Sequence, residues 1–453
     1  MSQPLSDAAP AQADYSRAAT RFARVMPLAF ITYGLAYFDR VNYASAEKDL
    51  SSALHLSAEI APMLSASFFL GYSLFQIPGA MYAARRSVKW LVFWALIFWG
   101  ALSGLTGVIR NVPLLFADRI LLGVVEGVVL PAMLIYLNRW FTKRERSRSN
   151  ALLMLTNPIT MATVSIACGL VIQWFDAHPL GGYRGWQMMF IVEGMPSIIW
   201  AFLWLRLSRE RPGDAEWLTS AEATTVQRML DGEQAQISQV KNYWAAFTNL
   251  SVIKLSLMFF CFSSASYGLM MWLPGILSQA THLSPAMTGL LSSIPYAVAV
   301  LSMIATSWLS DRSLRRKEYV VGSMLVGGAA FCVAFVAGPG HIVIFFLALT
   351  VVGSCIYTPT APLWAWMAEM LPRNVSGESM ALVNSFGALG GMLGTYMVGH
   401  LKNQYHSPGA AFIFQACCFA AAGVLGFSAR TRVSRSPAAE AAVPGAALVT
   451  PEP

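Results

Sequence analysis

The chain has 453 residues, of which 56% are hydrophobic and 12% are charged, and its mean hydropathy is +0.53. An average soluble domain is about 25% charged, and a soluble protein of this length could not bury so much apolar surface in one or two cores. The net charge of +8 invites a nucleic-acid interpretation, but the basic residues lie in short loops between apolar segments. The composition therefore predicts a polytopic membrane protein.

Apolar runs of about 20 residues, long enough to cross a bilayer as helices, recur twelve times along the chain. The first six cover residues 22–46, 60–83, 90–109, 113–138, 149–174 and 187–207. The second six cover residues 250–278, 286–310, 319–338, 342–370, 378–401 and 409–429. We therefore expect an all-α polytopic membrane protein with twelve transmembrane helices, in two six-helix bundles with pseudo-two-fold symmetry.

One long polar segment separates the two sets of six runs, and it is interpreted as a cytoplasmic linker with one short amphipathic helix. The stretch that starts at Pro131 returns in outline at Pro362, about half a chain later. Parallel repeats of this kind build transporters with two six-helix halves. The expected domains are a cytoplasmic N-terminal tail (1–21), an N-terminal bundle (22–207), the linker (208–248), a C-terminal bundle (249–430) and a disordered C-terminal tail (431–453).

Basic residues gather in alternate loops, for example over residues 139–148 and 312–317. Because lysine and arginine accumulate in cytoplasmic loops, we expect both termini to be cytoplasmic. Residues 1–20 lack the apolar core that a cleavable signal peptide needs. The cysteines and histidines show no metal-binding or redox spacing, so no cofactor is expected, and the chain is not expected to be an enzyme.

Charged side chains inside the apolar runs are the strongest functional signal, because each costs about 2.5–3.5 kcal/mol in hydrocarbon. Asp39 and Arg40 lie in the first run, and Arg119 and Glu126 lie seven residues apart in the fourth. Seven residues return to the same helix face about 10.5 Å further on. The arginine fork pairs with a carboxylate, and a buried carboxyl group can couple proton binding to site occupancy. The alternative is that Asp39 only neutralises a neighbouring arginine.

Further residues in the runs are weaker candidates. Gly123, between Arg119 and Glu126, leaves room for a neighbour, while Glu193 and Glu369 lie nearer the helix ends and are interpreted as structural. Amides facing lipid would be unsatisfied, which favours a cavity position for Gln76 and Asn384. Aromatic residues often pack against neighbours or lie in the interfacial belt. Those that could instead line a cavity are Tyr72, Tyr267, Trp272, Tyr357 and Trp364, while Tyr33 and Tyr37 share one helix face with Arg40.

Three stretches resemble the anion:cation symporter family of the major facilitator superfamily. They are "YFDRVNYASA", "RILLGVVEGVVLPAMLIYLNRWFTKRERSRSNAL" and "GWQMMFIVEGMPSIIWAFLWLRLSRERPGDAEWLT". The resemblance implies that the helix 1 arginine, Arg40, binds a substrate carboxylate and that Asp39 and Glu126 bind protons. With the candidates above, the expected substrate-binding residues are Arg40, Arg119, Tyr72, Gln76, Asn157, Trp272, Trp364 and Asn384.

One loop departs from the pattern of the superfamily. The loop after the second helix usually carries an acid that helps to lock the cytoplasmic side, and this chain has Ala84 there, with Ser87 in place of a glycine. The equivalent loop after the eighth helix keeps Asp311 and Arg312, which are the expected gating residues. Eukaryotic relatives tend to have a long glycosylated loop after the first helix. The short loop of this chain favours a bacterial inner-membrane protein.

The sequence thus predicts a monomeric transporter that imports a small organic anion by proton symport and alternating access. Its partners are the anion, protons and membrane lipid, and no nucleic acid. Efflux or exchange of an anion or drug, sodium-coupled uptake, a membrane enzyme and a non-transporting sensor are the alternatives. The aromatic content favours an aromatic or lactone-type acid over a sugar acid, but the sequence does not identify the substrate.

Overall fold

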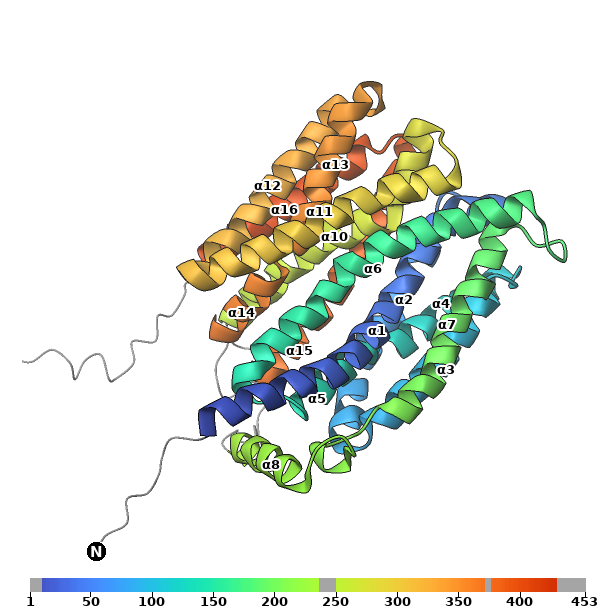
Figure 1. Ribbon diagram of the computed structural model, residues 1–453. Coiled ribbons are helices and arrows are strands. Elements are labelled where there is room, and N and C mark those ends of the chain that lie inside the picture. Colours follow the sequence, from blue (N-terminus) through green and yellow to red (C-terminus); the bar gives the residue numbers. More distant parts are fainter. Residues whose placement is uncertain (1–9, 236–249, 371–375, 430–453) are drawn as a thin grey trace, which may run out of the picture.

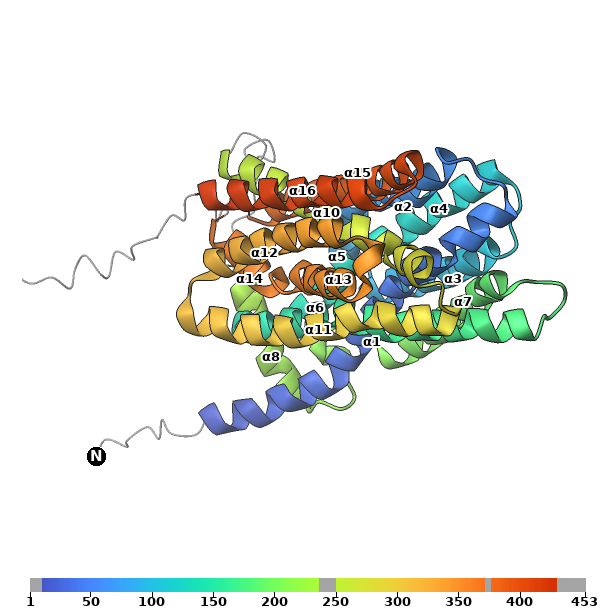
Figure 2. The same ribbon diagram turned by 90° about the horizontal axis from the view of Figure 1, so that it is seen from above.

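The computed structural model describes residues 10–235, 250–370 and 376–429, apart from the side chains of a few of them, Asp39 and Glu369 included. The described chain is nearly all helical, and its helices run side by side along one common direction (Figures 1 and 2). The predicted C-terminal tail, residues 431–453, lies outside the described residues.

Six spans precede the linker and six follow it. The first set is α1 (Pro10–Ala53), α2 (Ile60–Arg85), α3 (Val88–Thr106), α4 (Val112–Gly127) with α5 (Val129–Asn138), α6 (Lys143–Ala177) and α7 (Gly185–Leu207). The second set is α10 (Leu250–Thr281), α11 (Pro285–Ser313), α12 (Arg316–Ala337), η2 (Pro339–His341) with α13 (Ile342–Tyr357) and α14 (Thr360–Met370), α15 (Ser376–Tyr405) and α16 (Gly409–Ser428).

The twelve expected spans are therefore present. Among the described residues, ten helices are long and apolar enough to cross a membrane. The other two spans are α1 and α15, whose sequences contain more polar and charged residues. The same two helices supply much of the candidate site described below. Their polar residues can therefore face other helices and a cavity, and they need not contact lipid.

The repeat seen in the sequence corresponds to a repeated break in the helices. Pro131 is the third residue of α5, directly after the end of α4, and Pro362 is the third residue of α14, after the end of α13. Proline is tolerated in the first turn of a helix, where its missing N–H has no intrahelical partner. Each half of the chain thus interrupts its fourth span at the same place.

The spans pack in pairs within each set of helices, and a few of them also form the contacts between the two sets. Within the first set α2 packs against α4, α3 against α7 and α1 against α6, and within the second set α10 packs against α15 and α12 against α16. Between the sets α6 packs against α11, α2 against α15, and α1 against α10. A central site can therefore draw side chains from both sets.

The two ends of the bundle differ. At one end, called here the α8 end, the linker forms η1 (Pro212–Asp214) and α8 (Ser220–Ala235), which lie across the base of the first set (Figure 1). The expected amphipathic helix is confirmed, because Ala223, Val226 and Leu230 are buried on one face of α8. The opposite end, called here the far end, carries the loop between α1 and α2.

Helix α1 begins at Pro10, inside the segment assigned to the N-terminal tail. Arg21 is 2% exposed, and it donates to the Trp140 carbonyl oxygen at 2.8 Å and pairs with Glu145 at 2.6 Å. These contacts explain why the helix extends beyond the apolar run: Arg21 joins it to the loop before α6 and to the first turn of α6.

Close approach of α2 and α4 depends on glycine. A Cβ atom on Gly123 would lie 2.0 Å from the Phe68 carbonyl oxygen, and one on Gly71 would lie 2.0 Å from the Ile120 carbonyl oxygen. The room that the sequence predicted beside Gly123 is therefore filled by the backbone of α2. Such contacts cannot be relieved by rotating a side chain.

We expect Gly123→Ala to separate α2 from α4 and to lower stability by about 1–3 kcal/mol, the usual range for overpacking. Gly104→Ala is the matched control, because a Cβ atom there meets nothing within 4 Å, and alanine favours the helix by up to about 1 kcal/mol. Thermal unfolding of both purified variants in detergent measures the difference. Equal melting temperatures would contradict the proposed contact.

Candidate functional site

A cavity of about 90 Å³ lies between the two sets of helices. Its walls come from α1, α2, α5 and α6 on one side and from α10, α13, α14 and α15 on the other. Ligand pockets usually measure about 300–1,000 Å³, so side chains must move to admit a drug-sized solute. Its polar and aromatic lining residues include Tyr33, Tyr37, Tyr72, Asn157, Ser263, Ser266, Tyr267, Tyr357, Trp364 and Asn384.

Arg40 lies behind this aromatic wall. Its Nη2 is 2.6 Å from Glu126 Oε1, and its Nε donates to the same oxygen at 2.9 Å. Its Nη1 donates to the Tyr267 hydroxyl at 2.9 Å. Its guanidinium carbon is 4.4 Å from the centroid of the Tyr37 ring and 5.1 Å from that of Tyr72. The guanidinium group is thus held by one acid and by the tyrosines that separate it from the cavity.

The pair formed by Arg40 and Glu126 is almost fully buried, with side chains 3% and 1% exposed. Removing two charges from water is costly, and their mutual attraction compensates only when the geometry is good. If one partner loses its charge, the other stays buried without compensation. Any event that neutralises Glu126 therefore changes what Arg40 can bind.

Four of the expected substrate-binding residues line the cavity: Tyr72, Asn157, Trp364 and Asn384. A fifth, Gln76, lies beside it, where the Asn384 Nδ2 donates to the Gln76 Oε1 at 2.6 Å. This bond joins α2 to α15, and the bond of Arg40 to Tyr267 joins α1 to α10. Both connect the two sets of helices next to the cavity.

Two expected site residues lie away from the cavity. Arg119 is buried, with its guanidinium carbon 4.1 Å from the Tyr43 ring centroid, on the side of α4 that faces α1 and α2. Trp272 lies near the far end and donates through Nε1 to the Thr395 carbonyl oxygen at 3.0 Å. The side chain of Asp39 lies outside the described residues. Substrate or proton binding by these three residues stays a prediction.

Glu193 lies in a separate buried cluster of the first set. The Cys168 thiol is 3.4 Å from Glu193 Oε1 and 3.3 Å from Asn42 Oδ1. All three side chains are buried, and none lines the cavity. This placement agrees with the structural role expected for Glu193. The expectation for Glu369 lies outside the described side chains.

The expected gating pair lies at the α8 end of α11. Asp311 is 76% exposed and is 3.8 Å from Arg316, while Arg312 has its guanidinium carbon 3.8 Å from the Trp308 ring centroid. Asp311 and Arg312 therefore contact neighbours on α11 and α12. A gating role for them stays a prediction.

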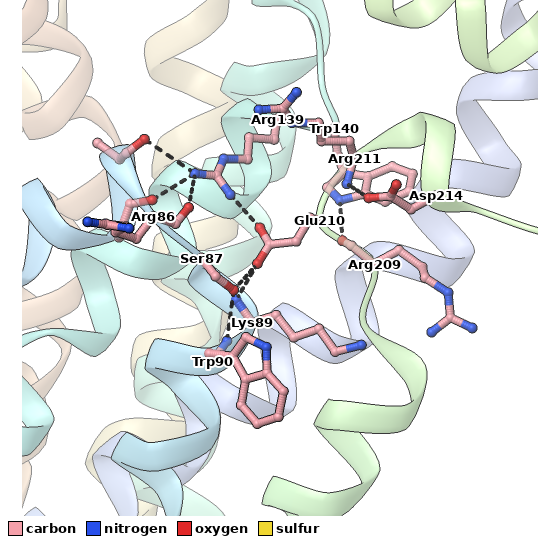
Figure 3. Close-up of polar contacts among 12 residues, drawn as sticks. Arg86, Ser87, Lys89, Trp90, Arg139, Trp140, Arg209, Glu210, Arg211 and Asp214 are labelled. Atoms are coloured by element: carbon pink, nitrogen blue, oxygen red, sulfur yellow. Dashed lines mark hydrogen bonds and ion pairs between the residues drawn. The ribbon is translucent and has the colours of Figure 1, made fainter.

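Glu210, which sequence reasoning missed, occupies the loop region where Ala84 replaces the usual acid. It accepts hydrogen bonds from the Ser87 hydroxyl and from the Lys89 backbone N–H, and it pairs with Arg139 (Figure 3). Arg139 also donates to the Ala83 carbonyl oxygen at 2.7 Å. An acid from the loop after α7 thus holds the loop between α2 and α3 together with the end of α5.

Only the fold could identify these contacts. Glu210 is 123 residues from Ser87 and lies in a polar stretch where an acid is unremarkable. Tyr267 was a candidate for the cavity wall, but its bond to Arg40 spans 227 residues. A possible signal for Glu210 was the loss of the acid at Ala84, which leaves the nearby arginines in need of another partner.

Comparison with known proteins gives a consistent result. The family model described as Major Facilitator Superfamily matches residues 29–395 and 255–449. A protein of Agrobacterium vitis named "Putative tartrate transporter" is 31% identical over 84% of each chain. A "Quinolone resistance transporter" of Acinetobacter baumannii is 26% identical over 86% of this chain and 89% of its own.

A solved structure of the xylose transporter XylE from E. coli, in an inward open conformation, has a TM-score of 0.72. It covers 90% of this chain and 96% of its own, and it is 13% identical. At this level of identity the similarity concerns the fold alone. It agrees with the expected two six-helix bundles.

We expect a double-mutant cycle on Arg40 and Glu126 to show strong coupling. Arg40→Gln and Glu126→Gln should each lower stability, by up to about 3–5 kcal/mol, because one buried charge remains without its partner. The double variant should lose less than the sum of the two. Thermal unfolding in detergent measures all three, and strictly additive losses would show that the pair does not act as a unit.

Glu210→Gln should lower stability by about 1–2 kcal/mol, because it weakens both the pair with Arg139 and the bonds to the start of α3. Glu216→Gln is the control. Glu216 is 88% exposed and is 3.3 Å from Arg209, and such surface pairs contribute little. If the two variants unfold at the same temperature, Glu210 does not hold this loop.

Proposed function

Because the chain belongs to the major facilitator superfamily of membrane transporters, we propose that it imports an organic carboxylate together with protons by alternating access. The buried pair of Arg40 and Glu126 beside the central cavity is the observation that carries this proposal. It combines a group suited to a carboxylate with a group that can bind a proton.

The proposed mechanism starts from competition for Arg40. While Glu126 is ionised, it holds the guanidinium group through two nitrogen atoms. A proton on Glu126 neutralises it and weakens this attraction, so the fork of Arg40 becomes available to a substrate carboxylate. Proton and anion then favour each other, and the charge added by the anion is compensated by the proton before the site changes orientation.

The contacts between the two sets of helices link this exchange to movement. The Arg40 bond to Tyr267 and the Gln76 bond to Asn384 both join the sets beside the cavity. A carboxylate that takes the Tyr267 position on Arg40 breaks one of them. Occupancy of the cavity therefore changes how the two halves are held, which alternating access requires.

One feature supports an inward-facing state, in which the far end is closed, and a second indicates which end of the molecule faces the cytoplasm. At the far end α6 and α11 meet closely: a Cβ atom on Gly169 would lie 2.4 Å from the Pro285 carbonyl oxygen, and one on Gly289 would lie 2.3 Å from that of Ser165. The basic loops lie at the α8 end, which favours the cytoplasm for that end. We propose the inner membrane of a bacterium as its location on another ground, the short loop between α1 and α2.

A carboxylate is the proposed substrate class because Arg40 contacts tyrosines of the cavity wall, and one of the relatives is named for tartrate. The tyrosines and Trp364 in the wall suit a flat or aromatic acid, whereas Asn157, Ser263 and Asn384 can bind hydroxyl groups. Efflux is the second candidate, because another relative is named for quinolone resistance.

In proteoliposomes that contain a pH-sensitive dye, we expect one acid from a panel of tartrate, galactonate, phthalate, hydroxybenzoate and muconolactone to acidify the lumen. Glu126→Gln should reduce this acidification by at least about tenfold, because the proton carrier is removed. Glu193→Gln, which changes another buried acid away from the cavity, should stay within about threefold of the wild-type protein.

Other results would refute parts of the proposal. Uptake of an acid without any change of lumenal pH would exclude proton symport and favour sodium coupling or exchange. A requirement for the opposite pH gradient would favour efflux. Equal loss in the Glu126 and Glu193 variants would show that the acid of α4 has no special part in coupling.

A further inference from the structure

A second, larger cavity of about 530 Å³ opens at the far end of the molecule. It lies where the ends of α1, α10 and α15 and the start of α2 meet, and it shares no lining residue with the central cavity. Its ionisable and amide lining residues are Glu47, Lys48, Gln279, Lys402, Asn403 and His406. We call it the far-end cavity.

Lys402 is the unusual residue of the far-end cavity. It is 8% exposed, although lysine is rarely buried unless it is paired. Its Nζ lies 4.7 Å from the centroid of the Trp272 ring. Within the described part of the chain, the structure gives it no hydrogen bond and no ion pair within 4.0 Å. An ammonium group has three hydrogen-bond donors. Among the described residues its nearby opposite charge is that of Glu47, in the wall of the same cavity, and no described group accepts a hydrogen bond from it.

The space next to Lys402 is kept open by a glycine. The nearest atom to a Cβ atom built on Gly275 is the Lys402 Nζ, at 3.8 Å. A larger side chain at this position of α10 would extend toward the ammonium group. The lysine side chain thus passes between the Trp272 ring and the surface of α10 at Gly275 and ends in the cavity.

The charge of the far-end cavity favours an anion. Lys48 and Lys402 contribute two ammonium groups, against the single carboxylate of Glu47. Glu47 accepts a hydrogen bond from the Ser51 hydroxyl at 3.1 Å, and no ion pair joins it to Lys402 within 4.0 Å. His406 is the fourth ionisable group in the wall and adds no negative charge. The positive groups therefore outnumber the negative one.

We propose that the far-end cavity is a second carboxylate-binding site, with the Lys402 ammonium group as its anchor. A carboxylate there accepts hydrogen bonds from the ammonium group and uses the amide groups of the wall for its remaining polar atoms. The proposal rests on the proposed function only for orientation, which puts the cavity on the non-cytoplasmic side of the membrane, and for the identity of the acid.

The position of this site relates it to transport. Glu47 lies on α1 and Lys402 on α15, and the Asn403 Nδ2 donates to the Ala58 carbonyl oxygen at 2.9 Å across the same junction. Because its walls come from both halves, the site is complete only while the far end is closed. A carboxylate bound there stabilises this closed arrangement, so external substrate slows the return to the outward-facing state.

The test measures how carboxylates raise the melting temperature of the full-length protein in detergent, since a ligand of the folded state raises stability with its concentration. Tartrate and benzoate are the probes, and sodium chloride at equal ionic strength is the control. The variants are Arg40→Gln, Lys402→Met and Lys402→Arg. Methionine keeps an unbranched stem against Trp272 without the charge. Arg110→Met removes an exposed far-end charge that lies outside the cavity.

We expect Arg40→Gln to retain part of the stabilisation by carboxylates. In that background, Lys402→Met should weaken the apparent dissociation constant at least about tenfold, Lys402→Arg should stay within about threefold, and Arg110→Met should have no effect. A shift that disappears in Arg40→Gln and is unchanged in Lys402→Met overturns the far-end site and leaves the central site intact.

The opposite pattern separates the two proposals. A shift lost in Lys402→Met and unchanged in Arg40→Gln supports the far-end site and contradicts carboxylate binding by Arg40. A wild-type protein that no carboxylate stabilises, or that chloride stabilises equally, overturns the far-end site. If Lys402→Met melts at the wild-type temperature without ligand, its loss of binding is not a loss of folding.

Discussion

A buried ion pair between α1 and α4 is the interaction on which the rest of the site depends. Arg40 and Glu126 are almost completely removed from water, where each charge alone would be very unfavourable. Their pairing allows both groups to be kept next to a cavity between the two halves. The same constraint makes the pair responsive, because a proton or an anion changes the balance for both partners.

The surrounding helices fix the geometry of this pair. Backbones of α2 and α4 approach so closely that Gly71 and Gly123 have no room for a side chain, and this places Glu126 opposite α1. Aromatic rings then cover the guanidinium group on several sides. Among the described residues, the hydrogen-bond partners of Arg40 are Glu126 and Tyr267, and a solute that enters the cavity would compete with them.

The charged residues at the two ends of the molecule have different surroundings. At the α8 end Glu210 links the loop between α2 and α3 to Arg139 (Figure 3), so the loss of the acid at Ala84 is compensated by an acid distant in sequence. At the far end Lys402 forms no hydrogen bond or ion pair within 4.0 Å with the described residues, and it faces a cavity whose wall also holds Glu47. The first arrangement strengthens one half internally, whereas the second lies on the junction between halves.

The sequence by itself determined the class of protein, the spans and several members of the site. Hydropathy and the distribution of basic loops suffice for this, because the bilayer requires long apolar helices, and a charge such as that of Arg40 or Glu126 inside one is conspicuous. Tertiary structure alone decided which of these groups meet. It paired Arg40 with Glu126 and Tyr267, put Arg119 and Trp272 away from the cavity, and gave Glu210 and Lys402 their surroundings. Such contacts join residues far apart in the chain, and they depend on the rotation and closeness of packed helices, which periodicity along one helix does not specify.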